Sequence, residues 1–352
     1  MTAGPIDAHA HIVPDSLIAA TRARGEALGV TYAPPPAGGA PALLFADGTR
    51  LRPFFAKLAE PEAERMASMA ATGLARQVLS AWTDMLGFGL APAQAVAWHR
   101  AMNEAFADLC RRNPGRFSFL ATGALQDPQA AAAELRRAVR EDGAVGAAAP
   151  ANFAGVNIGE LELDPWWAAV EETGRPVLVH PVDLAPGPRV RRWGLAQVAS
   201  YTFDTTLAAA SLIHMGVLDR FPGLRVFLPH GGGAFVWLSG RLDCMAGRVP
   251  AELRGAAQRP PSRYLDRFLF DSILHDPALL RILVGLVGAE RVMLGTDDGF
   301  PPADRDPLGT LRAAGLPEAQ TAAIAAGNAR AAFGLWGANA RHADDLPPAR
   351  HL

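Results

Sequence analysis

Residues 6–14 read IDAHAHIVP, a short apolar stretch that runs into a turn without glycine. A doubly wound α/β sheet usually binds phosphate on a glycine-rich turn after its first strand, and this turn has no such glycines. The stretch is therefore typical of the first strand of a different parallel α/β architecture, and the rest of the chain repeats its pattern.

Short apolar runs of this kind predict parallel strands that are buried on both faces. We expect strands over residues 6–13, 76–82, 117–125, 144–150, 176–181, 224–230, 268–274 and 292–296. Helical patterns lie between them, over residues 61–71, 92–112, 128–140, 166–173, 203–215, 276–287 and 317–326. Eight strand–helix repeats are the count of a (β/α)8 barrel, so the sequence predicts an α/β fold of the TIM-barrel type. A doubly wound open sheet is the alternative.

Two segments do not fit the repeat. Residues 14–60 form a long insertion after the first strand, with the Pro/Gly-rich centre YAPPPAGGAPALLFADG, and a long loop at this end of a barrel is often a lid. A disordered surface loop over residues 32–41 is the competing interpretation. Residues 338–352 form a polar tail, so the barrel domain is expected to span residues 1–337.

Composition excludes several classes of function. The 352 residues are 50% apolar, and 33 basic against 35 acidic side chains give a net charge of -2, which argues against nucleic-acid and anionic-membrane partners. No apolar run reaches the ~18 residues of a spanning helix, and two cysteines make no disulfide framework. We therefore expect a soluble cytoplasmic protein. Lys57 is the single lysine, so Schiff-base and carboxylated-lysine chemistry would both depend on it.

Histidines mark the ends of the predicted strands. His9 and His11 are two residues apart in the first strand, so their side chains are expected to project from the same face. His180 ends the fifth strand and His230 ends the sixth, while Asp297 ends the eighth. All of these positions are at the carboxyl ends of strands, where barrel enzymes build their active sites.

Three imidazoles and a carboxylate suit Zn²⁺ with room for a water molecule, and Mn²⁺ is compatible with the same set. The sequence therefore predicts a divalent metal site in a barrel enzyme. The remaining histidines of the barrel, His99, His214 and His275, fall in or beside helical patterns and are expected to be packing or surface residues.

The segments IDAHAHIVP, VLVHP, HGGGAFVWLSGRLD and RVMLGTDDGFP together resemble the amidohydrolase superfamily. Within it they resemble the branch typified by 2-amino-3-carboxymuconate-6-semialdehyde decarboxylase. The resemblance extends from Ile6 to about Leu335 and implies a homodimer that acts on a small carboxylate substrate.

The resemblance also implies roles for individual residues. His9, His11, His180 and Asp297 match the ligands of a single zinc ion whose shell a water molecule completes, and His230 matches an acid/base histidine. Among the expected substrate contacts are Arg52, which matches an arginine that binds a substrate carboxylate, and Phe300 and Arg248.

The sequence departs from the family pattern at several of these positions. Asp298 replaces a tyrosine that usually follows the metal-binding aspartate, and Val182 replaces a tryptophan. Val249 occupies the place of an arginine that the neighbouring subunit supplies in the prototype, with Arg248 one position away. The gain of Asp298 is expected to change how an anionic substrate is held.

Three functions remain open from the sequence. The first is metal-dependent, non-oxidative decarboxylation of a small unsaturated or aromatic carboxylic acid, with His230 and a zinc-bound water moving the proton. The second is a hydrolase or hydratase that acts on a lactone, amide or activated alkene, with Asp297 as the general base. The third is a non-catalytic barrel whose metal is structural, although structural zinc sites usually have four protein ligands and often cysteine.

Overall fold

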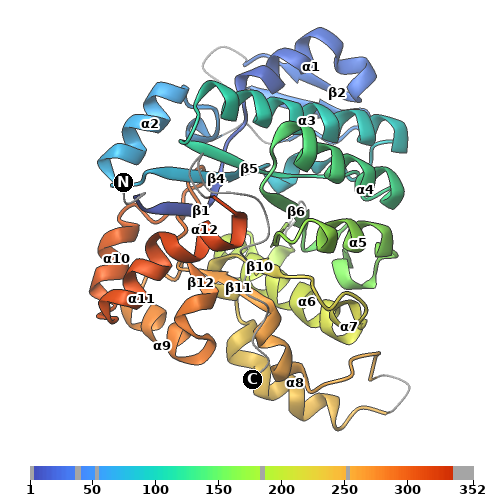
Figure 1. The fold of residues 1–352 in the computed structure, drawn as a ribbon. Coiled ribbons are helices and arrows are strands. Elements are labelled where there is room, and N and C mark those ends of the chain that lie inside the picture. The colour runs from blue at the N-terminus through green and yellow to red at the C-terminus, as the bar shows by residue number, and fades with distance from the viewer. Residues whose placement is uncertain (1–3, 36–40, 52–54, 183–186, 251–253, 336–352) are drawn as a thin grey trace.

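The computed structural model describes residues 4–35, 41–51, 55–182, 187–250 and 254–335. Eight parallel strands form a nearly closed barrel in these residues, and helices surround it (Figure 1). The strands, in their order around the barrel, are β1 (Ile6–His11), β4 (Arg76–Ser80), β5 (Phe117–Ala121), β6 (Gly146–Pro150), β9 (Val177–His180), β10 (Val226–Leu228), β11 (Phe268–Asp271) and β12 (Val292–Met293). All eight predicted strands are present.

Backbone hydrogen bonds join the last strand to the first. The N–H of Ala8 donates to the carbonyl of Leu294 at 2.8 Å, and the N–H of His11 donates to the carbonyl of Asp298 at 2.7 Å. An open doubly wound sheet would leave these groups at two separate edges, so the closure rules out the alternative fold.

The helices alternate with the strands as the sequence predicts. They are α2 (Glu62–Ala71), α3 (Pro92–Arg112), α4 (Pro128–Arg137), α5 (Asp164–Glu172), α6 (Tyr201–His214), α7 (Val217–Arg220), α8 (Phe235–Ala246), α9 (Pro277–Val287), α10 (Pro307–Ala313), α11 (Glu318–Ala322) and α12 (Asn328–Phe333). Proline in the first turn and an aspartate cap start several of them. Asp276, for example, accepts the N–H of Ala278 at 2.7 Å before α9.

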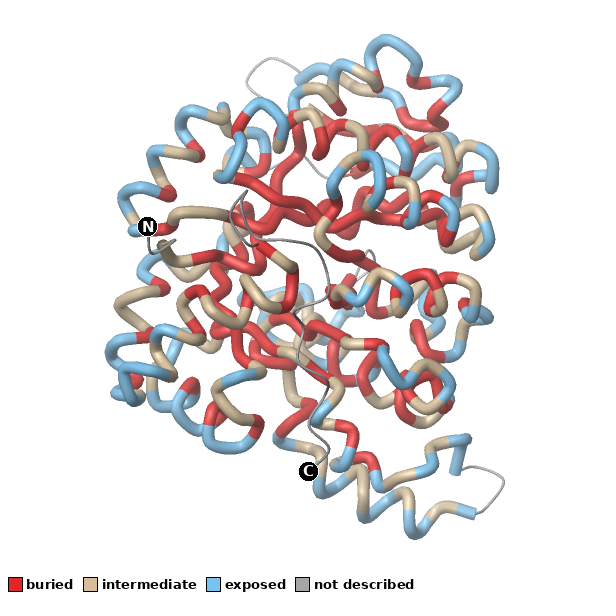
Figure 2. The backbone as a smooth tube through the Cα atoms, in the orientation of Figure 1, coloured by how far each residue is buried: buried red, intermediate tan, exposed pale blue. Residues whose placement is uncertain are grey.

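Side chains of the described residues fill the inside of the barrel. A buried cluster takes apolar side chains from successive strands, including Val78, Leu120 and Leu178, and Phe333 of α12 packs against Phe227 within it. Buried residues follow the strands and the inner faces of the helices, whereas the outer faces are exposed (Figure 2). This packing leaves the carboxyl ends of the strands as the place for a site.

Residues 14–60 contain regular structure. Helix α1 (Asp15–Leu28) and the antiparallel pair β2 (Val30–Ala33) and β3 (Ala42–Phe45) pack beside α3, with Leu17, Leu28 and Leu43 in the main core. Burial of an apolar face explains why the described parts of this segment are ordered. Residues 36–40, in its Pro/Gly-rich centre and within the loop predicted over residues 32–41, lie outside the described residues. A lid function for the insertion stays a prediction. The predicted tail, residues 338–352, lies outside the described residues.

One small pair of strands completes the fold. A two-stranded pair, β7 (Asn152–Phe153) and β8 (Val156–Asn157), follows β6. None of the helices in the described residues has the length and apolarity that a membrane crossing requires.

Candidate metal centre

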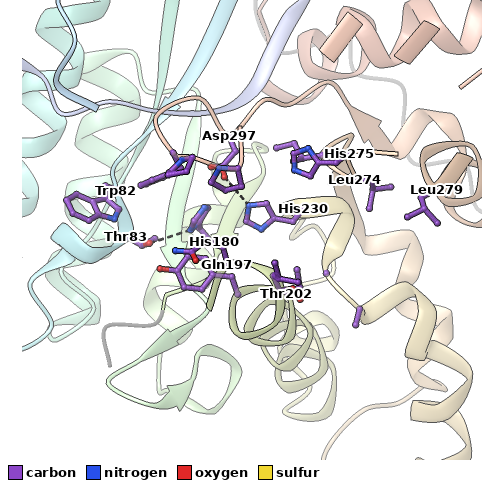
Figure 3. A pocket seen from close by; sticks show the side chains of 18 of the residues that line it. Trp82, Thr83, His180, Gln197, Thr202, His230, Leu274, His275, Leu279 and Asp297 are labelled. Atoms are coloured by element: carbon purple, nitrogen blue, oxygen red, sulfur yellow. Dashed lines mark hydrogen bonds and ion pairs between the residues drawn. The ribbon is translucent and has the colours of Figure 1, made fainter. Parts of the chain in front are cut away.

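Four histidine rings and one carboxylate meet at the carboxyl ends of the strands. The ring of His9 lies 5.0 Å from that of His11, 5.2 Å from that of His180 and 5.4 Å from that of His230, measured between centroids. Strand β1 has one more residue than β4 between Asp7 and Ala10, and such a bulge re-aims side chains at a barrel rim. The structure thus brings together all five side chains that the sequence singled out here. Figure 3 shows three of them, His180, His230 and Asp297.

The nitrogen and oxygen atoms of this cluster are separated by distances typical of ligands around one ion. Oδ1 of Asp297 lies 3.5 Å from Nε2 of His9 and 3.3 Å from Nε2 of His11, and these two nitrogens are 2.9 Å apart. One ligand atom from each of His9, His180, His230 and Asp297 lies within 4.8 Å of all the others. Ligands bonded at about 2.0–2.2 Å to a common ion have neighbours about 3 Å away, so the spacing fits a single divalent cation.

Hydrogen bonds on the outer nitrogens prepare the imidazoles to bind a metal. Nδ1 of His180 lies 2.8 Å from the carbonyl of Pro181, which only accepts, so Nδ1 carries the proton and Nε2 carries the lone pair. That Nε2 atom and Oδ1 of Asp297 are buried without a hydrogen-bond partner among the described residues. Buried polar atoms normally have partners, and a cation would satisfy both of these.

The charge states agree with this interpretation. Burial, together with the neighbouring His11 and His9, lowers the pKa of His180 well below its usual range, so the ring is neutral at pH 7. Burial alone would raise the pKa of Asp297, but the neighbouring imidazoles of His11 and His230 hold it well below its usual range. A neutral imidazole and an ionised carboxylate are the forms that bind a transition metal.

Asp271, at the end of β11, organises the cluster and was not singled out from the sequence. Its carboxylate accepts hydrogen bonds from Nδ1 of His9 at 2.8 Å and from the backbone N–H groups of His230 and Gly231 at 2.9 Å and 2.8 Å. These bonds orient one histidine and fix the turn that carries another. A carboxylate at a strand end, like that of Asp297, was the signal that could have found it.

A pocket of about 530 Å³ opens beside the cluster, with His180, His230 and Asp297 in its wall. Aromatic side chains form much of the remainder, namely Phe55, Trp82, Tyr201, Trp237 and Phe300. No lysine or arginine is found among the described residues that line it. The pocket therefore suits a flat apolar ring that carries a metal-binding group at one end.

The predicted substrate contacts have different outcomes in the structure. Phe300 lines the pocket, and its ring lies 4.9 Å from the ring of His11. Arg248 is exposed just beyond α8 and is absent from the described lining. Arg52 lies outside the described residues.

Asp298 is absent from the described lining of the pocket, whereas the sequence led us to expect that it would change how an anionic substrate is held. Its carboxylate forms an ion pair with the fully buried guanidinium of Arg65, which also donates to the carbonyl of His11 at 2.6 Å. A glycine with φ of +127° follows it, and the turn directs the two neighbouring aspartates to different partners. Asp298 thus supports, through Arg65, the backbone behind the cluster.

Residues 6–335 match the model of the Amidohydrolase family. The chain belongs to this family. The amidohydrolase is 32% identical over 225 residues to 2-amino-3-carboxymuconate-6-semialdehyde decarboxylase of Dictyostelium discoideum, a stretch that covers 64% of this chain and 63% of that protein. The matched part therefore spans less than two thirds of that relative.

Solved structures resemble the amidohydrolase over almost its whole length. The crystal structure of 5-carboxyvanillate decarboxylase from Sphingomonas paucimobilis has a TM-score of 0.77 and 25% identity, and the match covers 95% of this chain and 99% of that one. Dihydroxybenzoic acid decarboxylase from Polaromonas sp., solved with bound manganese and the inhibitor 2-nitroresorcinol, has a TM-score of 0.75 at 22% identity. This match covers 95% of this chain and 98% of that one.

Proposed function

We propose that this amidohydrolase is a metal-dependent, non-oxidative decarboxylase of a small aromatic or unsaturated carboxylic acid. The observation that supports this most is the opening of the histidine–aspartate cluster into an aromatic-walled pocket, in a family whose similar members are named decarboxylases. A bare cluster would fit many reactions, and the flat apolar pocket narrows the substrate to a ring or a conjugated acid.

His9, His11, His180 and Asp297 would hold the metal ion in this proposal. His9 and His11 are completely buried, whereas His230 is 15% exposed at the pocket and is better placed to meet a substrate. The ion is Zn²⁺ or Mn²⁺, since both accept imidazole and carboxylate ligands. When bound, it supplies a Lewis acid that polarises the substrate and an activated water.

His230 is the residue proposed to move the proton. Its Nε2 atom lies 3.6 Å from Oδ2 of Asp297, and its Nδ1 atom has no hydrogen-bond partner among the described residues. Decarboxylation requires a proton at the carbon that carries the carboxylate, after which the carbon–carbon bond breaks and CO2 leaves. An imidazole beside the pocket can deliver that proton as a general acid.

Carbon dioxide release tests the proposal directly. Purified protein loaded with Zn²⁺ or Mn²⁺ is incubated with a panel of hydroxybenzoic and unsaturated acids in D2O, and CO2 is measured together with deuterium at the former carboxyl carbon. We expect equal amounts of both. Hydrolysis of lactones or amides without any CO2 would support the hydrolase alternative instead.

A matched variant connects the reaction to His230. His230 has φ of +56°, and asparagine tolerates this conformation better than most residues, so His230→Asn removes the imidazole with little strain. We expect a loss in turnover of about 10²- to 10⁴-fold with metal content unchanged. Unchanged turnover would exclude His230 as the acid/base residue.

A homodimer is also proposed. Apolar side chains are exposed on α6, α8 and α9, including Phe203, Leu207, Trp237, Ile282 and Leu286. A second copy of the chain could cover such a surface. Sedimentation equilibrium distinguishes a dimer from a monomer, and a monomer at micromolar concentration would contradict the proposal.

A further inference from the structure

His275 lies at the pocket and outside the metal cluster. It occupies the turn between β11 and α9, one residue before the aspartate that caps α9, and its side chain lines the pocket together with His230 and Asp297 (Figure 3). The sequence pattern suggested a packing or surface histidine. Its place in the pocket wall indicates that it can contact a ligand.

The backbone of His275 is in a conformation that few residues adopt. Five non-glycine residues of the described chain have positive φ, and three of them, His230, His275 and Asp297, line this one pocket. Such conformations are strained in residues other than glycine and cluster at functional sites. In His230 and Asp297 this conformation directs the side chain toward the metal cluster. The same conformation at His275 therefore suggests that its side chain also has a function in the pocket.

The turn is held on both sides. Asp271 accepts the N–H of Ile273 at 3.0 Å, and Leu274 packs so closely on Gly231 that a side-chain carbon there would lie 2.6 Å from it. Asp276 then caps α9. The carboxylate that orients His9 thus also fixes the start of the turn that carries His275.

The imidazole of His275 is available to a ligand. It is exposed and makes no hydrogen bond or ion pair to any residue that the structure describes. The pocket has no arginine or lysine among its described lining, so His275 is the basic side chain there that the metal cluster does not use. An oxygen group on a ring would find a hydrogen-bond donor at this position.

We propose that His275 binds an oxygen substituent on the substrate ring, either a second carboxylate or a hydroxyl group, away from the carboxylate at the metal. The expected substrate is therefore an aromatic acid that carries a second carboxylate or a hydroxyl group in addition to the carboxylate at the metal. The inference rests on the proposed function for its substrate, and it adds a specificity-determining residue that neither the motifs nor the metal cluster contain.

Ligand binding tests this without any need for turnover. Isothermal calorimetry on the Mn²⁺-loaded protein compares benzoate with 3-hydroxybenzoate, isophthalate and terephthalate, for the parent chain and for His275→Gly and His275→Asn. Glycine adopts positive φ freely and asparagine tolerates it, so neither variant strains the turn. His214→Asn, in α6 and outside the described pocket lining, is the matched control.

We expect His275→Gly to reduce the affinity for at least one substituted acid by about 10-fold, which corresponds to the loss of one hydrogen bond to a charged group. The affinity for benzoate should change by less than about 2-fold. His275→Asn should recover part of the loss, and His214→Asn should change nothing. An equal loss for benzoate and the substituted acids, or no loss at all, would overturn the inference.

The outcomes also separate this inference from the proposed function. If His275→Gly selectively loses affinity for a substituted acid but the protein never releases CO2, the role of His275 is supported and the decarboxylase proposal is rejected. If the protein releases CO2 but His275→Gly shows no selective loss of affinity, the decarboxylase proposal is supported and the role of His275 is rejected. Failure of the parent protein to bind any of the four acids would overturn both.

Discussion

Oδ2 of Asp271 lies 2.8 Å from Nδ1 of His9, and both side chains are completely buried. Burial lowers the pKa of His9, but the hydrogen bond that its Nδ1–H donates to Asp271 and the charge of Asp297 outweigh it, and the pKa is raised. The same hydrogen bond lowers the pKa of Asp271 against the effect of its burial. The pair therefore holds the His9 ring in one orientation with Nε2 toward the cluster.

Asp271→Asn should weaken metal binding. The amide can still accept one hydrogen bond, but it carries no charge to increase the basicity of His9. Loss of such an outer partner typically reduces metal affinity by about 10- to 100-fold. Titration with a competing chelator measures the change. Asp266→Asn, at an exposed carboxylate near the start of the same strand, is the control, and equal affinities in the two variants would contradict the role of Asp271.

Metal binding should stabilise the folded chain. The cluster gathers buried ligand atoms that only the folded state brings together, so an ion at 100 times its dissociation constant adds about 2.7 kcal/mol to the free energy of unfolding. Thermal unfolding of chelator-treated protein, with and without Zn²⁺ or Mn²⁺, detects this as a higher midpoint. Mg²⁺ prefers oxygen ligands and should have little effect. His180→Gln should remove most of the stabilisation, and an unchanged Zn²⁺ response in that variant would argue against His180 as a ligand.

The fold could be predicted because its signal is repeated. Each strand is a short apolar run and each helix has its own amphipathic pattern, so eight independent repeats specify the barrel together. The histidines could be located for a related reason. Strand ends in a parallel barrel converge at one rim, so positions such as 9, 180 and 230 are brought together by the count of strands alone.

Features that depend on the path of a turn could not be predicted in this way. Asp297 and Asp298 are adjacent, and only the backbone turn shows that one joins the histidines while the other binds Arg65. His275 falls at a helix start by its pattern, but a positive φ turns it into the pocket wall. The order in α1 comes from packing against α3, which no local pattern reveals.

Arg65→Met should destabilise the protein strongly. The Arg65 guanidinium is completely buried, pairs with Asp298 and lies 2.7 Å from Glu60, so its removal takes the buried cation away from two carboxylates. Lys57, which is 35% exposed, is the remaining cation beside both of them among the described residues. Breaking a buried pair in this way costs about 3–5 kcal/mol, measured as the free energy of unfolding in urea. Adding Asp298→Asn should recover part of the loss, because one uncompensated charge disappears.

A surface ion pair provides the control for that measurement. Arg136 and Glu172 are 41% and 57% exposed, so Arg136→Met should cost no more than about 1 kcal/mol. Similar losses of unfolding free energy for Arg65→Met and Arg136→Met would show that the buried ion pair stabilises the fold no more than a surface pair does.

His99 should make stability depend on pH. Burial lowers its pKa to about 4, and its Nε2–H donates to the carbonyl of Leu86 at 3.0 Å while Nδ1 accepts from Thr122. Between pH 6.5 and 4 the unfolded chain therefore binds a proton at this residue that the folded chain does not. The free energy of unfolding falls as the pH falls through this window, by about 3 kcal/mol in total from this one group.

Asp7 has the opposite effect, so the contribution of His99 has to be isolated by difference. Burial raises the pKa of Asp7 to about 7, which makes the folded state bind a proton first and adds stability as the pH falls. Urea unfolding of the parent chain and of His99→Gln at several pH values between 4.5 and 7 cancels this common term. The variant should lose less stability on acidification than the parent does. Parallel curves would mean that His99 is protonated to the same extent in the folded and unfolded states.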